Sequence, residues 1–238
     1  MHDPLIILYN KYGFNSKLIK TQVNGALYKA IMLYNGNIGL AVTPTPETNI
    51  NLNTFSTPNF QDLEHRAILT AYYNSLLNYS NEYDNIIDIT DIVSLKQYTN
   101  IVMIGYCKPI AHTLQQKGFK INIFDDDKKE KVLLPRELKE AYLQNCDCAV
   151  VTATTLINGS IINILKSATT QTAVCLYGPS SIMCDEMFEF QQIKYIFGSI
   201  FKNNDQQLLN MIAEGSGTPD FSKLMQKVCF QKSNSYNN

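Results

Sequence analysis

The chain has 238 residues, of which 45% are hydrophobic, and its formal net charge is −1. This length suits one large or two small domains. No apolar run approaches the ~20 residues of a membrane-spanning helix, so we expect no membrane insertion. The start lacks the pattern of a signal peptide, and no basic stripe is present. We therefore expect a cytoplasmic protein that does not bind nucleic acid.

The beginning of the chain predicts a short helix followed by a small antiparallel sheet. Residues 4–14 carry an apolar pattern that fits an amphipathic helix. Residues 17–43 are rich in strand-forming residues. They are interrupted by Asn-Gly at 24–25 and by Asn-Gly-Asn at 35–37. Both interruptions are typical of tight hairpin turns, so we predict a three-stranded meander.

A long helix is predicted to cover this meander. Residues 47–59 are polar and indicate a loop. Over residues 60–79, apolar side chains recur at helical spacing, which is the pattern of an amphipathic helix. Glu64, His65 and Arg66 stand together on this segment, and we interpret them as a solvated face.

The second part of the chain alternates strands with helices. A short helix is predicted over residues 88–98, and the domain boundary is expected near residues 80–90. Alternation from residue 99 onward predicts a parallel sheet wrapped by helices. The predicted strands cover residues 100–107, 119–127, 146–154, 172–180 and 194–201, and the helices cover residues 109–118, 137–144, 160–168 and 205–214.

The predicted fold class is therefore α/β. A small N-terminal α+β domain occupies residues 1–85, a Rossmann-like parallel-sheet domain occupies residues 86–231, and residues 232–238 form a disordered tail.

Small and hydroxylic residues follow two of the predicted strands. In open α/β sheets, ligands bind at the carboxyl ends of the strands. We therefore expect a small-molecule site there. The backbone amides and hydroxyls of the second group suit a carboxylate or phosphate, although a turn with a serine N-cap explains the same residues equally well. The expected site residues are Thr152, Thr154, Thr155, Asn158, Gly178, Pro179, Ser180 and Ser181.

The first predicted strand ends in a partial dinucleotide-binding pattern. Gly105, Tyr106 and Cys107 form the turn, and Asp125 ends the next strand, where such folds place an acid that binds ribose. The full fingerprint requires three glycines, and this turn has one. A nucleotide-type cofactor, NAD or S-adenosylmethionine, is therefore the weaker interpretation beside an ordinary strand–helix corner.

The six cysteines raise the alternative of a metal site. Cys107 and Cys184 are candidates for a soft-metal pair, with His65 or His112 as further ligands. Their spacing matches no zinc module, so reduced and mostly buried thiols are the favoured interpretation.

Cys146 and Cys148 are two residues apart and are predicted to share one face of a strand. No GxSxG, HExxH or Walker lysine motif occurs in the sequence. If the protein is an enzyme, Cys107 or Lys108 is the candidate for the reactive side chain. The sequence leaves open whether it is one.

Five segments together resemble a known family. They read IVMIGYCKPI, INIFDDD, CDCAVVTATTLINGSIINIL, CLYGPSSIM and YIFGSIFKNNDQQLLNMIAEGSG. Over roughly residues 85–230, these segments are similar to the heavy-metal chelation domain family, a Rossmann-like family of unknown function. The most specific pieces are residues 154–160 and 178–180.

The upstream part is similar to the small domain that accompanies this family, which resembles the N-terminal domain of enolase. Residues 39–41 and the segment ILTAYYNSLL, which includes Asn74, carry this weaker resemblance. The resemblance implies a cleft between the two domains, with Asn74, Thr154, Asn158 and residues 178–180 near it.

Three functions remain after this reading. The first is binding or processing of a small anionic ligand, with a metal chelate or metallophore as an example. The second is a Rossmann-like transferase, lyase or dehydrogenase with a nucleotide-type cofactor. The third is an assembly or regulatory subunit with a vestigial cleft. A homodimer is the base-rate expectation for any of them.

Overall fold

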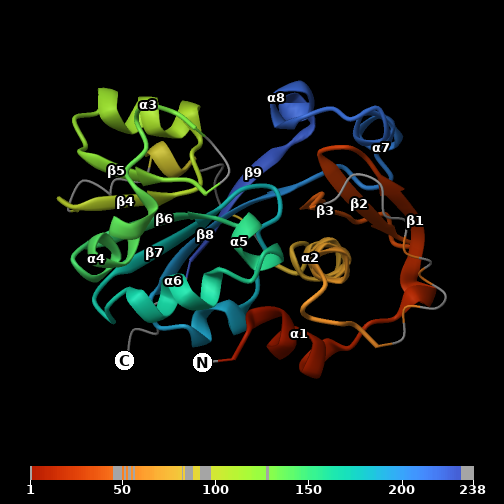
Figure 1. Cartoon of the computed structure of the whole chain (residues 1–238). Helices are drawn as coiled ribbons and strands as arrows, with labels where there is room; N and C mark the ends of the chain where they lie inside the picture. Colours follow the sequence, from red (N-terminus) through yellow and green to blue (C-terminus); the bar gives the residue numbers. More distant parts are fainter. Residues whose placement is uncertain are drawn as a thin grey trace, which may run out of the picture.

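The computed structural model describes residues 2–44, 50, 52, 55, 57–81, 83, 88–91, 98–126 and 129–231. It contains a three-stranded antiparallel sheet and a six-stranded, mostly parallel sheet. This arrangement confirms the predicted α/β fold class. Figure 1 shows the two sheets with helices packed around them.

The N-terminal unit consists of the meander and two helices. The strands β1 (Ile19–Asn24), β2 (Tyr28–Leu33) and β3 (Ile38–Val42) pair in chain order. Helix α1 (Pro4–Tyr12) begins after Asp3, whose side chain accepts the Leu5 amide hydrogen. Helix α2 (Leu63–Leu77) covers one face of the meander, as predicted.

The six-stranded sheet has the order β5-β4-β6-β7-β8-β9. Its first five members are parallel, and β9 joins the edge antiparallel to β8. Strand β9 was not predicted, because a six-residue segment with three polar side chains has a weak strand pattern. The strands are β4 (Ile101–Ile104), β5 (Ile121–Phe124), β6 (Cys148–Thr152), β7 (Ala173–Tyr177), β8 (Ile193–Ile200) and β9 (Gln226–Gln231).

Helices cover both faces of this sheet. Helix α3 (Lys108–Gln116) lies on one face, and α4 (Lys139–Gln144) and α6 (Ile161–Ser167) lie on the other (Figure 1). The four-residue helix α5 (Thr154–Ile157) precedes α6 and contacts α2. The remaining short helices are η1 (Ser16–Leu18), η2 (Ile89–Asp91), η4 (Arg136–Leu138), η5 (Asp185–Glu189) and η6 (Ser222–Leu224).

The last two α-helices pack on the N-terminal unit rather than on the parallel sheet. Helices α7 (Gln206–Ala213) and α8 (Thr218–Phe221) lie beside the meander in Figure 1. Together they cover the face of the meander that α2 leaves open. The chain then returns to the large sheet as β9. The two units are therefore interlocked. The buried side chains of this contact are Ala30, Met32, Ile38, Leu40, Phe201, Leu208, Leu209, Ile212 and Phe221.

One prediction for α2 was wrong. Glu64 and Arg66 are 5% and 3% exposed, so they do not form a solvated face. The helix is packed on several sides, and its charges are paired. Glu64 contacts Lys29 at 2.9 Å, and Arg66 contacts Asp3 at 2.9 Å.

Three other predictions fall wholly or partly outside the described residues. Residues 89–91 of the predicted helix over 88–98 form η2, but residues 92–97 are not described. The predicted tail at 232–238 and most of the predicted loop at 47–59 also lie outside. Within the described ranges, no helix is both long and apolar enough to span a bilayer.

The six-stranded sheet and the helices that cover it form the second unit of the chain. Helix α1 contacts this second unit through the buried carboxylate of Glu186. Lys11 and Tyr12 both donate hydrogen bonds to the Glu186 side chain. Burial alone raises the pKa of Glu186, but the hydrogen bond from Lys11 and its other donors outweigh burial and bring the pKa to about 2. The ionised carboxylate therefore stabilises the contact between the two units.

A depressed pKa predicts a loss of stability in acid. Above the usual glutamate pKa the contribution of Glu186 is complete, and it disappears as pH falls toward 2. Between pH 5 and pH 2.5, we expect the wild type to lose on the order of 1–2 kcal/mol more unfolding free energy than Glu186→Gln. Urea unfolding at both pH values measures this. Glu189→Gln removes an exposed carboxyl from the same turn and should behave like the wild type. If the unfolding free energy falls by the same amount between the two pH values in all three proteins, the ionised Glu186 side chain does not stabilise the fold.

Candidate functional site

A cavity of about 850 Å³ opens where the parallel strands end. The loops after β4, β5, β6 and β7 form its floor and walls. Residues from β2, β3, η2, α4, β8, α8, η6 and β9 also line it. The structure brings together eleven of the residues singled out from the sequence, namely Gly105, Tyr106, Cys107, Asp125, Thr152, Thr154, Thr155, Asn158, Gly178, Pro179 and Ser180.

Asn74 lies behind the cavity wall. Its side chain is fully buried, and its amide group donates to the carbonyl oxygens of Pro179 and Ser181, each at 2.9 Å. Ser181 is also fully buried and does not line the cavity. Asn74 therefore fixes the loop after β7 from behind.

Two further asparagines continue this support, and sequence reasoning missed them. Asn78 donates to the Ser181 carbonyl at 2.9 Å and accepts the Met183 amide hydrogen at 2.7 Å. Asn81 donates to the Met183 carbonyl at 3.0 Å. Asparagines at positions 74, 78 and 81 follow the helical i, i+4, i+7 spacing of α2 and the turn after it. From this spacing, the sequence could have predicted that the three asparagines lie on one side of the helix, where they can hold a neighbouring loop.

The loop after β7 also contacts the meander directly. The Ser180 hydroxyl accepts the Val42 amide hydrogen at 3.0 Å, and Ser180 is only 2% exposed. Its hydroxyl therefore joins the two units. Gly178 differs, because its φ of +119° requires glycine and a Cβ atom there would meet nothing within 4 Å. The backbone at Gly178 is thus open to a ligand.

The turn after β4 is held by its neighbours. The Asp125 carboxylate accepts the Tyr106 amide hydrogen at 2.7 Å, and the Tyr177 hydroxyl donates to the Gly105 carbonyl at 2.6 Å. Burial raises the pKa of Tyr177, so this hydroxyl keeps its proton. A Cβ atom on Gly105 would lie 2.4 Å from a methyl carbon of Thr152. The Asp125 carboxylate, which follows β5, therefore holds the turn after β4.

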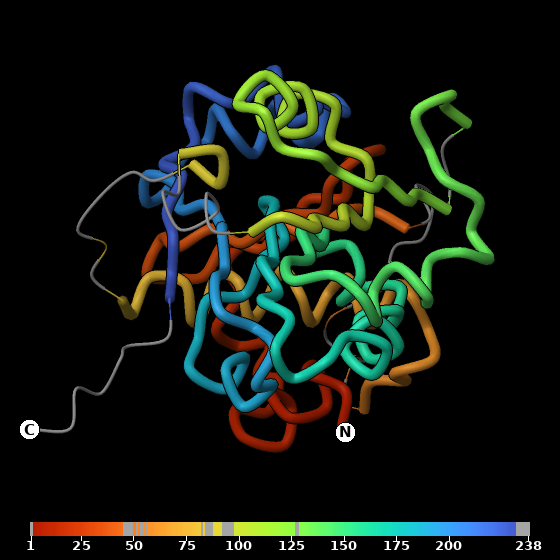
Figure 2. Tube along the Cα trace, turned by 90° about the vertical axis from the view of Figure 1, so that its left-hand side faces the viewer, coloured from red at the N-terminus to blue at the C-terminus, as the bar shows by residue number. Residues whose placement is uncertain are grey.

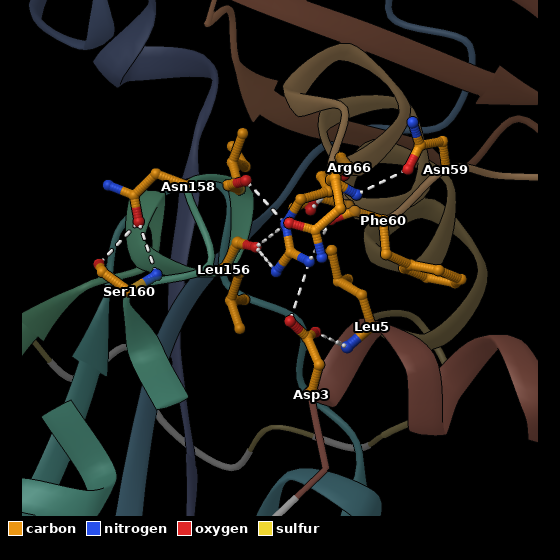
Figure 3. Close-up of polar contacts among 11 residues, drawn as sticks. Asp3, Leu5, Asn59, Phe60, Arg66, Leu156, Asn158 and Ser160 are labelled. Carbon is orange, nitrogen blue, oxygen red and sulfur yellow. Dashed lines mark hydrogen bonds and ion pairs between the residues drawn. The ribbon is translucent and has the colours of Figure 1, made fainter. Parts of the chain in front are cut away.

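Helix α5 and the loop after it are fixed by Arg66 (Figure 3). The guanidinium group donates to the carbonyl oxygens of Leu156 at 2.5 Å and Ile157 at 2.8 Å, while its other side contacts Asp3. These carbonyls end a helix, where a cation is favoured. The loop that follows reaches the cavity, where the Asn158 side-chain oxygen accepts two hydrogen bonds from Ser160.

Charged side chains at the cavity were mostly missed from the sequence. Lys139 contacts Asp126 at 3.0 Å, and Lys227 contacts Asp88 at 2.6 Å. Burial raises the pKa of Asp88, but the Lys227 hydrogen bond outweighs burial, and the net shift is downward. Lys108 begins α3 at the cavity rim and is exposed. These residues are distant in sequence, so only the fold reveals that they share a cavity.

An arm of the chain extends this rim. Residues 129–138 stand away from the body in Figure 2, and Glu130 from this arm lines the cavity. The rim therefore carries charges of both signs around an interior of hydroxyl and aromatic groups.

The two thiols proposed as a metal pair are not brought together. Cys107 is half-buried and lines the cavity. It also packs against the apolar cluster that lies between α3 and the large sheet. Cys184 is buried in the larger cluster on the other face of the sheet. His65 accepts the Asn59 amide hydrogen, and His112 is exposed on α3. Among the residues with described positions, no three His, Cys, Asp or Glu side chains form a metal-binding group.

The prediction that Cys146 and Cys148 share a strand face was wrong. Strand β6 begins at Cys148, so strand alternation does not reach Cys146. Cys146 lies in the larger core cluster, where its thiol contacts the Leu143 carbonyl, and Cys148 lies in the cluster on the opposite face.

A parallel sheet whose strand ends open on a cavity shared with a small α+β unit defines a Rossmann-like class of protein. Residues 88–231 match the model of the DUF364 family, which is described as "Putative heavy-metal chelation". This match spans more than half of the chain, and the chain belongs to this family. None of the curated proteins matches it.

Two solved structures share the fold over nearly the whole chain. One is a DUF364 protein of unknown function from Pyrococcus horikoshii, with a TM-score of 0.79 and 17% identity, covering 97% of this chain and 99% of that one. The other is a DUF364 protein of unknown function from Desulfitobacterium hafniense, with a TM-score of 0.77 and 18% identity, covering 97% of each chain. At this identity, the likeness establishes the fold alone.

Proposed function

We propose that this protein binds a small anionic ligand in the cavity, and that the ligand is a metal chelate of the metallophore type. The observation that carries the proposal is the cavity itself. Its 850 Å³ falls within the range of small-molecule sites, roughly 300–1,000 Å³, and far exceeds what a bare ion needs. The family description points to metal chelation and supports the same class of ligand.

Two features favour an anion. Helix α3 begins at the cavity, and its N-cap residue, Cys107, makes no side-chain capping bond, so the amide hydrogens of Lys108 and Ile110 are available, whereas Pro109 has none. Lys108 adds an exposed ammonium group at the same place, and it takes part in none of the ion pairs between described residues. The open backbone at Gly178 and the amide of Asn158 supply neutral polar contacts on the opposite wall.

We also propose that the N-terminal unit is an enolase-N-terminal-like domain over residues 1–85 and that residues 86–231 form the Rossmann-like domain. The order of three meander strands followed by the covering helix α2 supports this assignment. With this division, the second domain forms the floor of the cavity. The first domain forms one part of its rim, which includes Tyr28 and Val42.

Ligand-induced stabilisation tests the proposal. The probes are nickel citrate, citrate alone and nickel chloride, each added to the full chain at concentrations up to about 100 times the apparent Kd. A ligand at that excess stabilises the folded state by about 2.7 kcal/mol. We expect nickel citrate to raise the melting temperature more than either component does. Native mass spectrometry of protein purified from its own host should show a co-purified organic mass.

Matched variants locate the site. Lys108→Ala and Asn158→Ala should reduce the stabilisation by nickel citrate. Lys120→Ala removes an exposed lysine near the opposite end of β5 and should leave it unchanged. The proposal fails if nickel chloride stabilises the protein as much as the complex does, or if all three variants respond alike.

A further inference from the structure

One buried hydroxyl group faces the cavity without a partner. Ser199 on β8 lines the cavity and is 2% exposed. It follows Phe197 by two residues, so both side chains lie on the face of β8 that packs toward α3. Every other described serine or threonine of the cavity lining has a side-chain hydrogen bond, whereas the Ser199 hydroxyl has none to a described residue. A buried hydroxyl without a partner is costly, so Ser199 is open to a polar group of a ligand.

The charges around Ser199 favour a neutral polar group. Lys227 pairs directly with Ser199 across the β8–β9 ladder, and its ammonium group contacts Asp88 at 2.6 Å. Asp88 and Lys227 both line the cavity and balance one another. A carboxylate buried beside them would have to share the ammonium group with Asp88, and an incompletely compensated charge is costly to bury. A serine hydroxyl both donates and accepts, so it suits a ligand hydroxyl.

The floor of the cavity next to Ser199 is aromatic. Tyr177 and Phe197 are direct neighbours in the β7–β8 register, and both line the cavity. The Tyr177 hydroxyl donates to the Gly105 carbonyl, so the two side chains offer ring surface. Tyr28 lines the cavity from the meander. A ligand in this part of the cavity therefore meets aromatic groups from both units.

The aromatic floor separates two polar ends of the cavity. The start of α3, where the anionic group is proposed to bind, follows β4. Ser199 lies on β8, and β6 and β7 lie between these two strands. With neighbouring strands about 4.8 Å apart, the two ends are roughly 14 Å from one another. A ligand that reaches both ends must therefore be elongated, with an apolar middle.

We propose that Ser199 holds a hydroxyl group carried by an aromatic ring of the ligand, and that this ring lies on Tyr177 and Phe197. The inference rests on the proposed function, because the anionic chelate then occupies the α3 end and the ring extends toward β8. Aromatic rings gain from contact with other rings beyond the area that they bury. A phenol, with a pKa of about 10, is neutral at pH 7 and supplies the uncharged hydroxyl that this end favours. The ligand is thus a hydroxyaryl chelate rather than a purely aliphatic one.

Matched nickel chelates test the hydroxyl contact. The probes are the nickel complexes of N-(4-hydroxybenzyl)iminodiacetate and N-benzyliminodiacetate, which differ by one hydroxyl group at the end away from the metal. Isothermal titration calorimetry of the full chain measures both affinities. On the scale of one net hydrogen bond, the wild type should bind the hydroxyl compound about five-fold more tightly. In Ser199→Ala, the two compounds should bind equally.

Ser222→Ala is the control variant. Ser222 also lines the cavity, but its hydroxyl donates to the Pro219 carbonyl at 2.9 Å, so the preference for the hydroxyl compound should survive its removal. The nickel complex of N-methyliminodiacetate tests the ring contact, because it lacks the ring and should bind the wild type more weakly than the benzyl complex. Equal affinity of the methyl and benzyl complexes contradicts the ring contact. An unchanged hydroxyl preference in Ser199→Ala contradicts the serine contact.

The metal-free compounds separate this inference from the proposed function. If the hydroxyl compound binds equally well with and without nickel, and Ser199→Ala abolishes the hydroxyl preference, Ser199 holds the hydroxyl but the ligand is not a metal chelate. If the nickel complexes bind and the wild type does not distinguish them, the chelate proposal stands and the Ser199 contact is wrong. If no compound of the series binds, both proposals fail.

Discussion

Replacing Arg66 with alanine should lower the free energy of unfolding by about 3–5 kcal/mol. Arg66 is 3% exposed and is held by Asp3 and by the carbonyl oxygens of Leu156, Ile157 and Phe60. The substitution leaves a mostly buried carboxylate without its cation and two buried carbonyls without donors, and each of these losses is costly. Urea unfolding at neutral pH measures the change.

Two comparisons show whether burial is the cause. Lys117→Ala removes an exposed ion pair with Asp91 at 3.2 Å and should cost less than about 1 kcal/mol. Arg66→Lys keeps the charge but loses the planar fork that reaches several acceptors at once, so its cost should fall between the two. If Arg66→Ala costs no more than Lys117→Ala, Arg66 does not hold the units together.

Arg66 also explains why α2 is central to the proposed site. Near its start the helix fixes α5 through Arg66, and near its end it fixes the loop after β7 through Asn74 and Asn78. Both supported segments line the cavity, and α2 itself does not. The N-terminal unit therefore sets the shape of a cavity whose floor belongs to the second unit.

The sequence predicted those parts of the fold that local patterns determine. Apolar strand segments that alternate with helical segments along the chain predicted β4 to β8. The Asn-Gly turns predicted the meander. Small and hydroxylic residues at strand ends, such as Gly178 and Thr152, indicated the position of the cavity, because parallel strands bring their carboxyl ends to one edge of a sheet.

The sequence could not predict contacts whose partners are distant along the chain. Arg66 and Leu156 are separated by 90 positions, so charge at position 66 indicated only an exposed face. Nothing local shows that α7 and α8 cross to the meander, since their apolar faces fit either sheet. Lys227 was missed for a related reason, because β9 follows that crossing and carries a weak strand pattern.

Replacing Gly39 with alanine is the second substitution from which we expect a large effect, a loss of about 3 kcal/mol in unfolding free energy. Gly39 lies on β3, where α2 crosses it closely. A Cβ atom there would lie 2.1 Å from the Ala71 carbonyl oxygen and 2.3 Å from the Ser75 amide nitrogen. Both contacts are with backbone, so no side-chain rotation relieves them, and α2 has to move away from the meander.

Gly217→Ala is the matched control. Gly217 also has an ordinary negative φ, and its nearest neighbour to a new Cβ atom would be a Leu27 methyl carbon at 3.4 Å. Its cost should stay below about 1 kcal/mol, the scale of losing a good N-cap residue. Urea unfolding of both variants gives the comparison. Because a displaced α2 carries Asn74 with it, Gly39→Ala should also weaken the stabilisation by nickel citrate, and Gly217→Ala should not. Equal stability of the two variants would mean that α2 and β3 tolerate a wider separation, and that the cavity wall does not depend on their close contact.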